Sequence, residues 1–268
     1  MEFYLDEKQR KKRRRILKLK IFATVTVFLF LLSGFFYLIA FSQIFKIKSI
    51  FAVSENAKYN LEADKLVGDL KNFFVSRSKI SKFLGGDNIL VWSGGISDFL
   101  KTQPIFSVLE INKNYFKREI SIKFEKRERY GVWCQKNAAC WWIDKNGIVF
   151  EKAPKVEGEM ILKVNDNSDQ QLDFGKGVLR DDLFKNLIKI FEILQKTGIN
   201  IKTLYIENLA LEEIEARPLI NSIPQIYFSL RLDPAFALSA IKSFKKIGLN
   251  KIKYIDFRIE NRVYYKLK

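Results

Sequence analysis

The sequence predicts an α+β protein with a single N-terminal transmembrane helix, a small β-α-α-β-β domain and then a mainly antiparallel β domain with two flanking helices. Three observations predict this layout: a charge-free run at residues 21–41, short segments that alternate apolar and polar residues as half-buried strands do, and amphipathic stretches with helical spacing between them. The expected boundaries are 1–20 for a basic tail, 21–43 for the transmembrane helix, 45–126 for the first domain and 127–268 for the second.

The N-terminal segment predicts a membrane anchor. Nine Lys and Arg side chains lie in residues 1–20, and the run IFATVTVFLFLLSGFFYLIAF that follows has no charge. Its length, at 1.5 Å per residue, is about 32 Å, which is enough to cross a hydrocarbon core of about 30 Å. Because only Lys46 and Lys48 follow closely, the positive-inside rule predicts a cytoplasmic N-terminus and an extracytoplasmic remainder.

Two other interpretations of this segment are weaker. A cleaved signal peptide is one, since Ala40-Phe41-Ser42 resembles a cleavage site, but the run is longer than the usual apolar region of about 7–15 residues. Nucleic-acid binding by the basic tail is the other, and the position of the tail directly before an apolar run favours an orienting role instead. We therefore expect contact with membrane lipid through residues 21–43 and no nucleic-acid partner.

Composition argues against catalysis. The chain has no histidine and only two cysteines, so the commonest general base and the commonest metal ligand are both missing. Ser76-x-x-Lys79 and Lys196-Thr197-Gly198 match motifs of penicillin-binding proteins. No Ser-x-Asn lies between them, and further Ser-x-x-Lys matches at Ser239 and Ser243 show that the pattern arises easily here. We expect no enzyme activity, no cofactor, no metal and no small-molecule substrate.

The first domain is expected to contain two helices between strands. Helical spacing of Leu66, Leu70 and Phe74 predicts the longer helix, with Asn60 as its N-cap. In chain order, the expected elements are a strand at 45–53, helices at 61–75 and 96–101, and strands at 105–113 and 119–124.

The second domain is expected to be a run of short strands interrupted by two helices. Cys134 and Cys140 flank QKNAA between two aromatic-rich strands, which predicts a hairpin with a cross-strand disulfide, although two free thiols are the alternative. The expected strands are 130–134, 140–144, 148–152, 160–164, 201–208, 211–219 and 225–232, the helices are 181–197 and 235–246, and 251–268 is a long strand or a hairpin about Glu260-Asn261.

Four segments resemble a known family when they are taken in order behind a basic-flanked span. They are GGDNILVW at 85–92, the stretch from FLKTQPIF to RYGVW at 99–133, CWWIDKNGIVFEKAP at 140–154 and YIDFRIENRVYYK at 254–266. Together they resemble the FtsQ/DivIB proteins of the bacterial divisome, whose layout is a cytoplasmic tail, one span, a POTRA domain and a β domain. The chain departs at Lys113, Phe116 and Arg129, where the family commonly has arginine, proline and proline.

The resemblance implies a scaffold of the plasma membrane at the division septum that binds FtsB/FtsL-like coiled-coil partners and links them to septal peptidoglycan synthesis. A terminal strand has unpaired backbone N–H and C=O groups to which an extended partner segment adds. The contact residues implied by the closing motif are Arg258, Ile259, Glu260, Asn261, Arg262, Val263 and Tyr265.

Two alternatives to this function remain open. The alternation in the closing segment also fits odd-numbered side chains in the core and even-numbered side chains on a solvated face. Another POTRA-bearing membrane protein, acting in protein export or envelope assembly, is the alternative at the level of function, although the chain has no room for the C-terminal barrel of outer-membrane assembly proteins.

Overall fold

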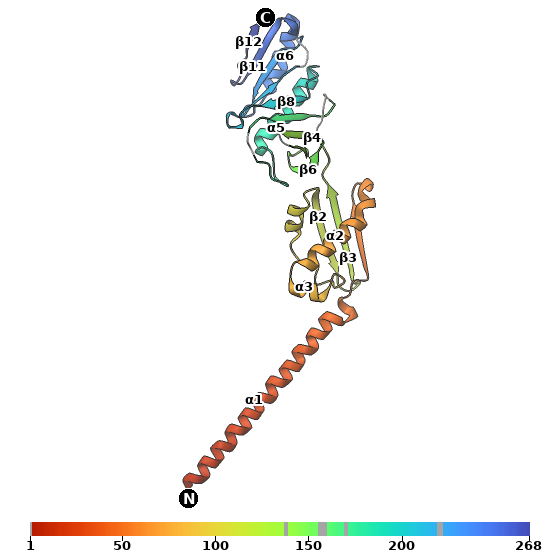
Figure 1. The fold of residues 1–268 in the computed structure, drawn as a ribbon, viewed down its shortest axis with the longest axis vertical. Coiled ribbons are helices and arrows are strands. Elements are labelled where there is room, and N and C mark those ends of the chain that lie inside the picture. Colours follow the sequence, from red (N-terminus) through yellow and green to blue (C-terminus); the bar gives the residue numbers. More distant parts are fainter. Residues whose placement is uncertain (1, 137–138, 155–159, 169–170, 219–221) are drawn as a thin grey trace. The chain divides into compact units, whose positions relative to one another are not determined.

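The protein has a mixed α+β fold (Figure 1), seen in a computed structural model that describes residues 2–136, 139–154, 160–168, 171–218 and 222–268. Asn137 and Ala138 of the expected hairpin turn, and Leu219 at the end of an expected strand, lie outside these residues. The chain forms two compact units, residues 1–95 with 110–124 and residues 96–109 with 125–268.

Helix α1 (Glu2–Phe41) includes the whole charge-free run. By length and composition, its portion from Arg10 to Phe41 could cross a membrane. Thr24 and Thr26 each donate their hydroxyl to the carbonyl four residues earlier, so these polar groups do not interrupt the apolar surface. A short 3-10 turn, η1 (Gln43–Phe45), follows.

A three-stranded sheet in the order β1-β3-β2 follows α1. Strand β1 pairs in parallel with β3, and this pairing requires a crossover, which the intervening helices provide. The longest of them, α2, buries Leu66, Leu70 and Phe74 as the helical spacing predicts. The elements are β1 (Ser49–Ser54), η2 (Ala57–Glu62), α2 (Ala63–Ser76), α3 (Lys79–Leu84), α4 (Ile96–Thr102), β2 (Phe106–Asn114) and β3 (Glu119–Lys126).

The sequence-based prediction is wrong on two details of this part. Helix α3 was not predicted, since it has only six residues and is too short to show a period; Ser78 caps it by accepting from the Ser81 N–H at 3.0 Å. Asn60 does not cap α2, because its side chain instead accepts from the Ser54 N–H at 3.0 Å. Leu61, next to it, is 95% exposed.

The second sheet has nine strands in the order β12-β11-β10-β9-β8-β7-β4-β5-β6. Inward side chains of the strands and the apolar faces of two helices, α5 and α6, form its main core. The elements are β4 (Gly131–Gln135), β5 (Cys140–Ile143), β6 (Val149–Ala153), β7 (Lys163–Asp166), α5 (Asp181–Lys196), β8 (Thr203–Ile206), η3 (Leu209–Leu211), β9 (Glu213–Ala216), β10 (Gln225–Ser229), α6 (Ala235–Ile247), η4 (Leu249–Lys251), β11 (Ile252–Phe257) and β12 (Tyr264–Leu267).

Most neighbouring strands of this sheet are antiparallel, but β7 is an exception. It does not add to β6 and instead pairs in parallel with both β4 and β8. Helix α5 connects β7 to β8, and α6 connects β10 to β11, which are also parallel. The sheet is therefore mainly antiparallel with two strand-helix-strand crossovers.

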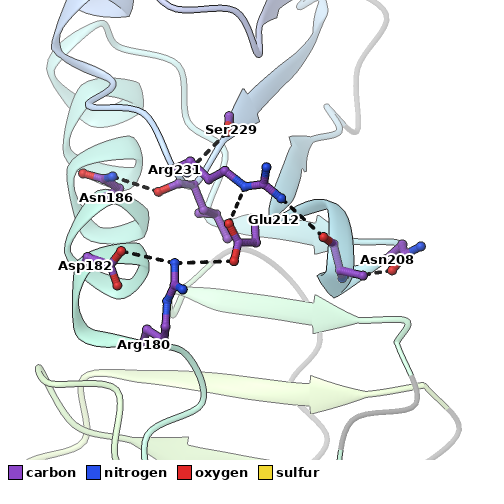
Figure 2. A network of polar contacts seen from close by, with 9 residues as sticks. Arg180, Asp182, Asn186, Asn208, Glu212, Ser229 and Arg231 are labelled. Carbon is purple, nitrogen blue, oxygen red and sulfur yellow. Dashed lines mark hydrogen bonds and ion pairs between the residues drawn. The ribbon is translucent and has the colours of Figure 1, made fainter.

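A polar network fastens the start of α5 to the segments around β9 and β10 (Figure 2). Glu212, whose backbone is left-handed (φ 53°), accepts from Arg231 and lies 3.5 Å from the guanidinium of Arg180. Asn186 on α5 donates to the Leu230 carbonyl at 2.8 Å. Because Leu230 directly follows β10, these contacts fix the connection from which α6 begins.

The structure joins Cys134 and Cys140 by a disulfide across the β4–β5 hairpin. Replacing both cysteines with alanine is expected to lower the free energy of unfolding by about 2 kcal/mol, since the closed ring is short and the loss of loop entropy correspondingly small. Urea titration of the variant, and of the unchanged chain with and without a reductant, measures this. Identical midpoints in all these titrations would contradict a stabilising role for the bond.

Candidate partner-binding edge of the sheet

The closing segment is a hairpin, the second of the two predicted forms. Strand β11 enters it with Ile252, Ile255 and Phe257 buried against the helices. The turn closes where the Arg262 N–H donates to the Ile259 carbonyl at 3.2 Å. Asn261 has a positive φ of 53°, a conformation that asparagine tolerates better than most residues.

Strand β12 ends the sheet, and in the described part of the chain it pairs with β11 alone. The Lys268 N–H donates to the Lys251 carbonyl at 3.0 Å. Since backbone groups of alternate residues point to the same side of an antiparallel strand, those of Tyr264 and Lys266 point toward β11 and those of Tyr265 and Leu267 point away from it. These outward N–H and C=O groups can receive an added strand.

Apolar side chains line the helix side of this edge. The rings of Tyr265 and Phe244 of α6 meet with their centroids 5.0 Å apart. Leu267, opposite the buried Ile252, is exposed. An added strand would therefore find hydrogen-bonding groups along β12 and an apolar strip beside them.

The Arg258 side chain is held in place by contacts within its own unit. Its guanidinium donates to both carboxylate oxygens of Asp256, at 2.9 and 2.6 Å, and to Glu213 on β9 at 2.8 Å. It also lies over the Tyr227 ring, 4.9 Å from its centroid. The side chain is 37% exposed, so one face is accessible while its position is fixed by β9, β10 and β11.

Ionisation reinforces this cluster. Burial opposes the charged form of Asp256, but hydrogen bonds from the Arg258 side chain and backbone outweigh burial and lower the pKa of Asp256. Hydrogen bonds to Asp256 and Glu213 in turn raise the pKa of Arg258. Both groups are therefore charged at neutral pH.

The turn residues border a cavity of about 190 Å³ at the start of α6. Ile259, Glu260, Asn261 and Arg262 form one side, and Phe236 of α6 contributes to the other. The volume is below the roughly 300 Å³ at which small-molecule pockets begin and is suited to a single side chain. This cavity lies at the turn end of the hairpin.

Val263 differs from the other expected contact residues. It is half-buried and packs against the main core, as the core interpretation of the alternation predicts. Ile259 and Tyr265 are about half-exposed instead. The structure thus brings the turn residues to the cavity and Tyr265 to the open edge, and leaves Val263 a packing role.

The C-terminal segment is strongly basic. Residues 235–268, which form α6, β11 and β12, contain nine Lys and Arg side chains and only two acidic ones, Asp256 and Glu260. The carboxylate of Asp256 forms an ion pair with Arg258. A positive surface of this kind favours an acidic partner through long-range attraction and through pairing at the contact.

Replacing Arg258 with methionine is expected to lower the free energy of unfolding by about 1 kcal/mol at neutral pH, because a partly exposed charge pair is lost. The lowered pKa of Asp256 makes its carboxylate stabilising above the ordinary value of about 4, and this contribution disappears as the pH falls through the lowered pKa. The difference between variant and unchanged chain should therefore shrink in acid. Urea titrations at neutral and acidic pH test this, and a pH-independent difference would contradict it.

Several residues of this edge were not selected from the sequence. Leu267 and Tyr264 belong to the same strand as Tyr265, and the closing alternation was the available signal. Phe244 and Phe236 come from α6, and their positions beside Tyr265 and the turn residues depend on the parallel β10–β11 pairing, for which the sequence has no local signal.

Other candidate sites are weaker. Among the described residues, no group of three or more His, Cys, Asp or Glu side chains is placed to hold a metal ion. The Ser76 hydroxyl donates to the Phe73 carbonyl at the end of α2, and Thr197 is buried with its hydroxyl bonded to the last turn of α5. Both are ordinary helix ends.

Searches against models of known protein families and against curated proteins found no match to this chain. The resemblance to FtsQ/DivIB proteins therefore remains a prediction from the residues.

Proposed function

We propose that this chain is a membrane-anchored scaffold of the FtsQ/DivIB type, with a POTRA-like domain after its span and a β domain that captures an extended partner segment at β12. The observation that carries the proposal is the row of outward backbone groups at Tyr265 and Leu267 beside the apolar strip of α6. Main-chain hydrogen bonds would supply affinity and the strip and cavity would set the register.

The partner's side-chain pattern follows from the two faces of β12. Tyr265 and Leu267 lie on the face of Ile255 and Ile252, toward α6, whereas Lys266 lies on the other face. A matching strand would place apolar side chains toward α6 and carboxylates toward Lys266. We assign this role to an FtsB/FtsL-like coiled-coil protein with an acidic, alternating segment.

The anchor sets where this binding takes place. With nine basic residues before the charge-free run at 21–41 and two just after it, the proposed topology has the N-terminus in the cytoplasm and the folded parts of the chain outside the plasma membrane. Binding there would link the partners to septal peptidoglycan synthesis, and the chain itself would perform no chemistry.

Co-purification from detergent-solubilised membranes tests the proposal. A tagged full-length chain should retain FtsB/FtsL-like proteins in amounts close to its own, and the same chain with Tyr265→Asp should retain few, because the substitution puts a carboxylate on the apolar strip. Recovery of outer-membrane assembly or export proteins instead would favour the other POTRA-bearing class and overturn the division role.

A further inference from the structure

We propose that α3 lies in the interfacial layer of the membrane, with Ile80 and Phe83 in contact with lipid and Lys79 and Lys82 among the headgroups. The inference rests on the proposed span of α1 and adds a second, peripheral lipid contact to it. It is carried by the contacts that fasten the segment after α3 to the end of α1.

The end of α1 is bonded directly to the chain that follows α3. The buried Asn88 donates its side-chain N–H to the Ile39 carbonyl at 2.9 Å. The Ile89 N–H donates to the Phe45 carbonyl at 2.9 Å, and the Ile47 N–H to the Asp87 carbonyl at 2.8 Å. Ile39 lies two residues before the end of the charge-free run, about 3 Å along the helix axis, so the bond from Asn88 ties the segment after α3 to the expected lipid boundary.

Apolar side chains gather near the end of α1. The Phe83 ring meets the Phe41 ring edge-on with 6.3 Å between centroids. Phe83 is 61% exposed and Ile80, one turn earlier on α3, is 64% exposed. Ile44, just past α1, is also exposed. In water this cluster would be an exposed apolar patch, whereas at a bilayer surface it enters the acyl region.

The charges beside the cluster match a lipid surface. Lys79 and Lys82 belong to α3, which has no acidic residue, and Lys46 and Lys48 follow α1. Lysine stems extend along apolar surface while the ammonium groups reach the phosphates. Exposed apolar groups beside basic ones are the pattern of interfacial helices.

The same unit contains a matched control. Leu61 is 95% exposed, more than Phe83, but it lies in η2, beyond the far end of β1. Strand β1 starts near Lys48 and rises about 3.3 Å per residue, so its six residues carry the chain about 20 Å from its starting point. If exposure alone decided lipid contact, Leu61 would contact lipid at least as readily as Phe83, whereas the proposal places only Phe83 in lipid.

The experiment uses the full chain in vesicles of phosphatidylcholine and phosphatidylglycerol. Single cysteines replace Phe30, Leu61 or Phe83 and carry an environment-sensitive fluorophore; the native cysteines are joined to each other and do not react. Bromine atoms on the acyl chains then quench labels that contact lipid. The expected result is blue-shifted, quenched emission at positions 30 and 83 and unquenched emission at position 61.

The outcomes separate the two proposals. Quenching at position 30 with a solvent-like label at position 83 would overturn the interfacial role of α3 and leave the span intact. A solvent-like label at position 30 would overturn the span itself. As a second test, a label at Ile80 should lose its quenching when Phe83→Asp is added and keep it when Leu61→Asp, at the more exposed position, is added. Loss with both or with neither would contradict the proposal.

Discussion

Replacing Leu267 with proline is expected to weaken partner capture by roughly 10-fold or more. The outward N–H of Leu267 disappears and the partner carbonyl opposite it is left unsatisfied, a cost of about 1–3 kcal/mol. The hairpin itself should persist, because proline is tolerated on an edge strand where the N–H faces outward. Titration of purified partner against the full chain in detergent measures the dissociation constant.

Two neighbouring variants separate the backbone from the side chain. Leu267→Ala removes the side chain and keeps the N–H, so we expect a smaller loss of affinity than with proline. Lys266→Pro removes an N–H that points toward β11 and should lower the free energy of unfolding instead. If alanine and proline at position 267 weakened binding equally, strand addition would not be the source of affinity.

Replacing Arg127 with methionine is expected to lower the free energy of unfolding by about 3–5 kcal/mol, the largest stability effect anticipated for this chain. Arg127 pairs with Asp144, whose side chain is buried, and also donates to the Pro104 carbonyl at 3.0 Å. The other oxygen of Asp144 accepts from the N–H groups of Asn146 and Ile148, both at 2.9 Å. Without the guanidinium, the carboxylate that closes the β5–β6 turn would be buried without its cation.

A double-mutant cycle identifies the cause. Asp144→Asn keeps an oxygen for the turn and removes the charge, so the double variant Arg127→Met, Asp144→Asn should be more stable than the sum of the single losses implies. Urea unfolding of the four proteins provides the comparison. Additive losses, or a loss below about 1 kcal/mol for Arg127→Met alone, would contradict a buried-charge origin.

Elements with strong local signals were predictable from the sequence. The amphipathic face of α5 and the alternation of β2 and β3 place those elements within one or two residues of their observed bounds. Leu187, Ile190 and Leu194, which the helical period places on one face, are buried. The periodicity of apolar residues therefore predicted these elements.

Long-range pairing was not predictable in the same way. Strand β7 follows β6 in the chain, yet it pairs in parallel with β4 and β8, and this parallel pairing, which requires the α5 crossover, has no local signal in the sequence. At the candidate site, too, contacts between segments far apart in the sequence were not predictable. Its hairpin residues form one contiguous segment and were selected together, whereas the α6 residues reach β12 only through the parallel β10–β11 pairing.

Backbone amide hydrogen exchange at β12 tests the central claim most directly. In the free chain, the amides of Tyr265 and Leu267 should exchange readily, while that of Lys266, directed toward β11, should be protected. Adding the partner should protect Tyr265 and Leu267 strongly and change Lys266 little. Protection confined to other surfaces, with Tyr265 and Leu267 still exchanging freely in the complex, would contradict capture by strand addition at this edge.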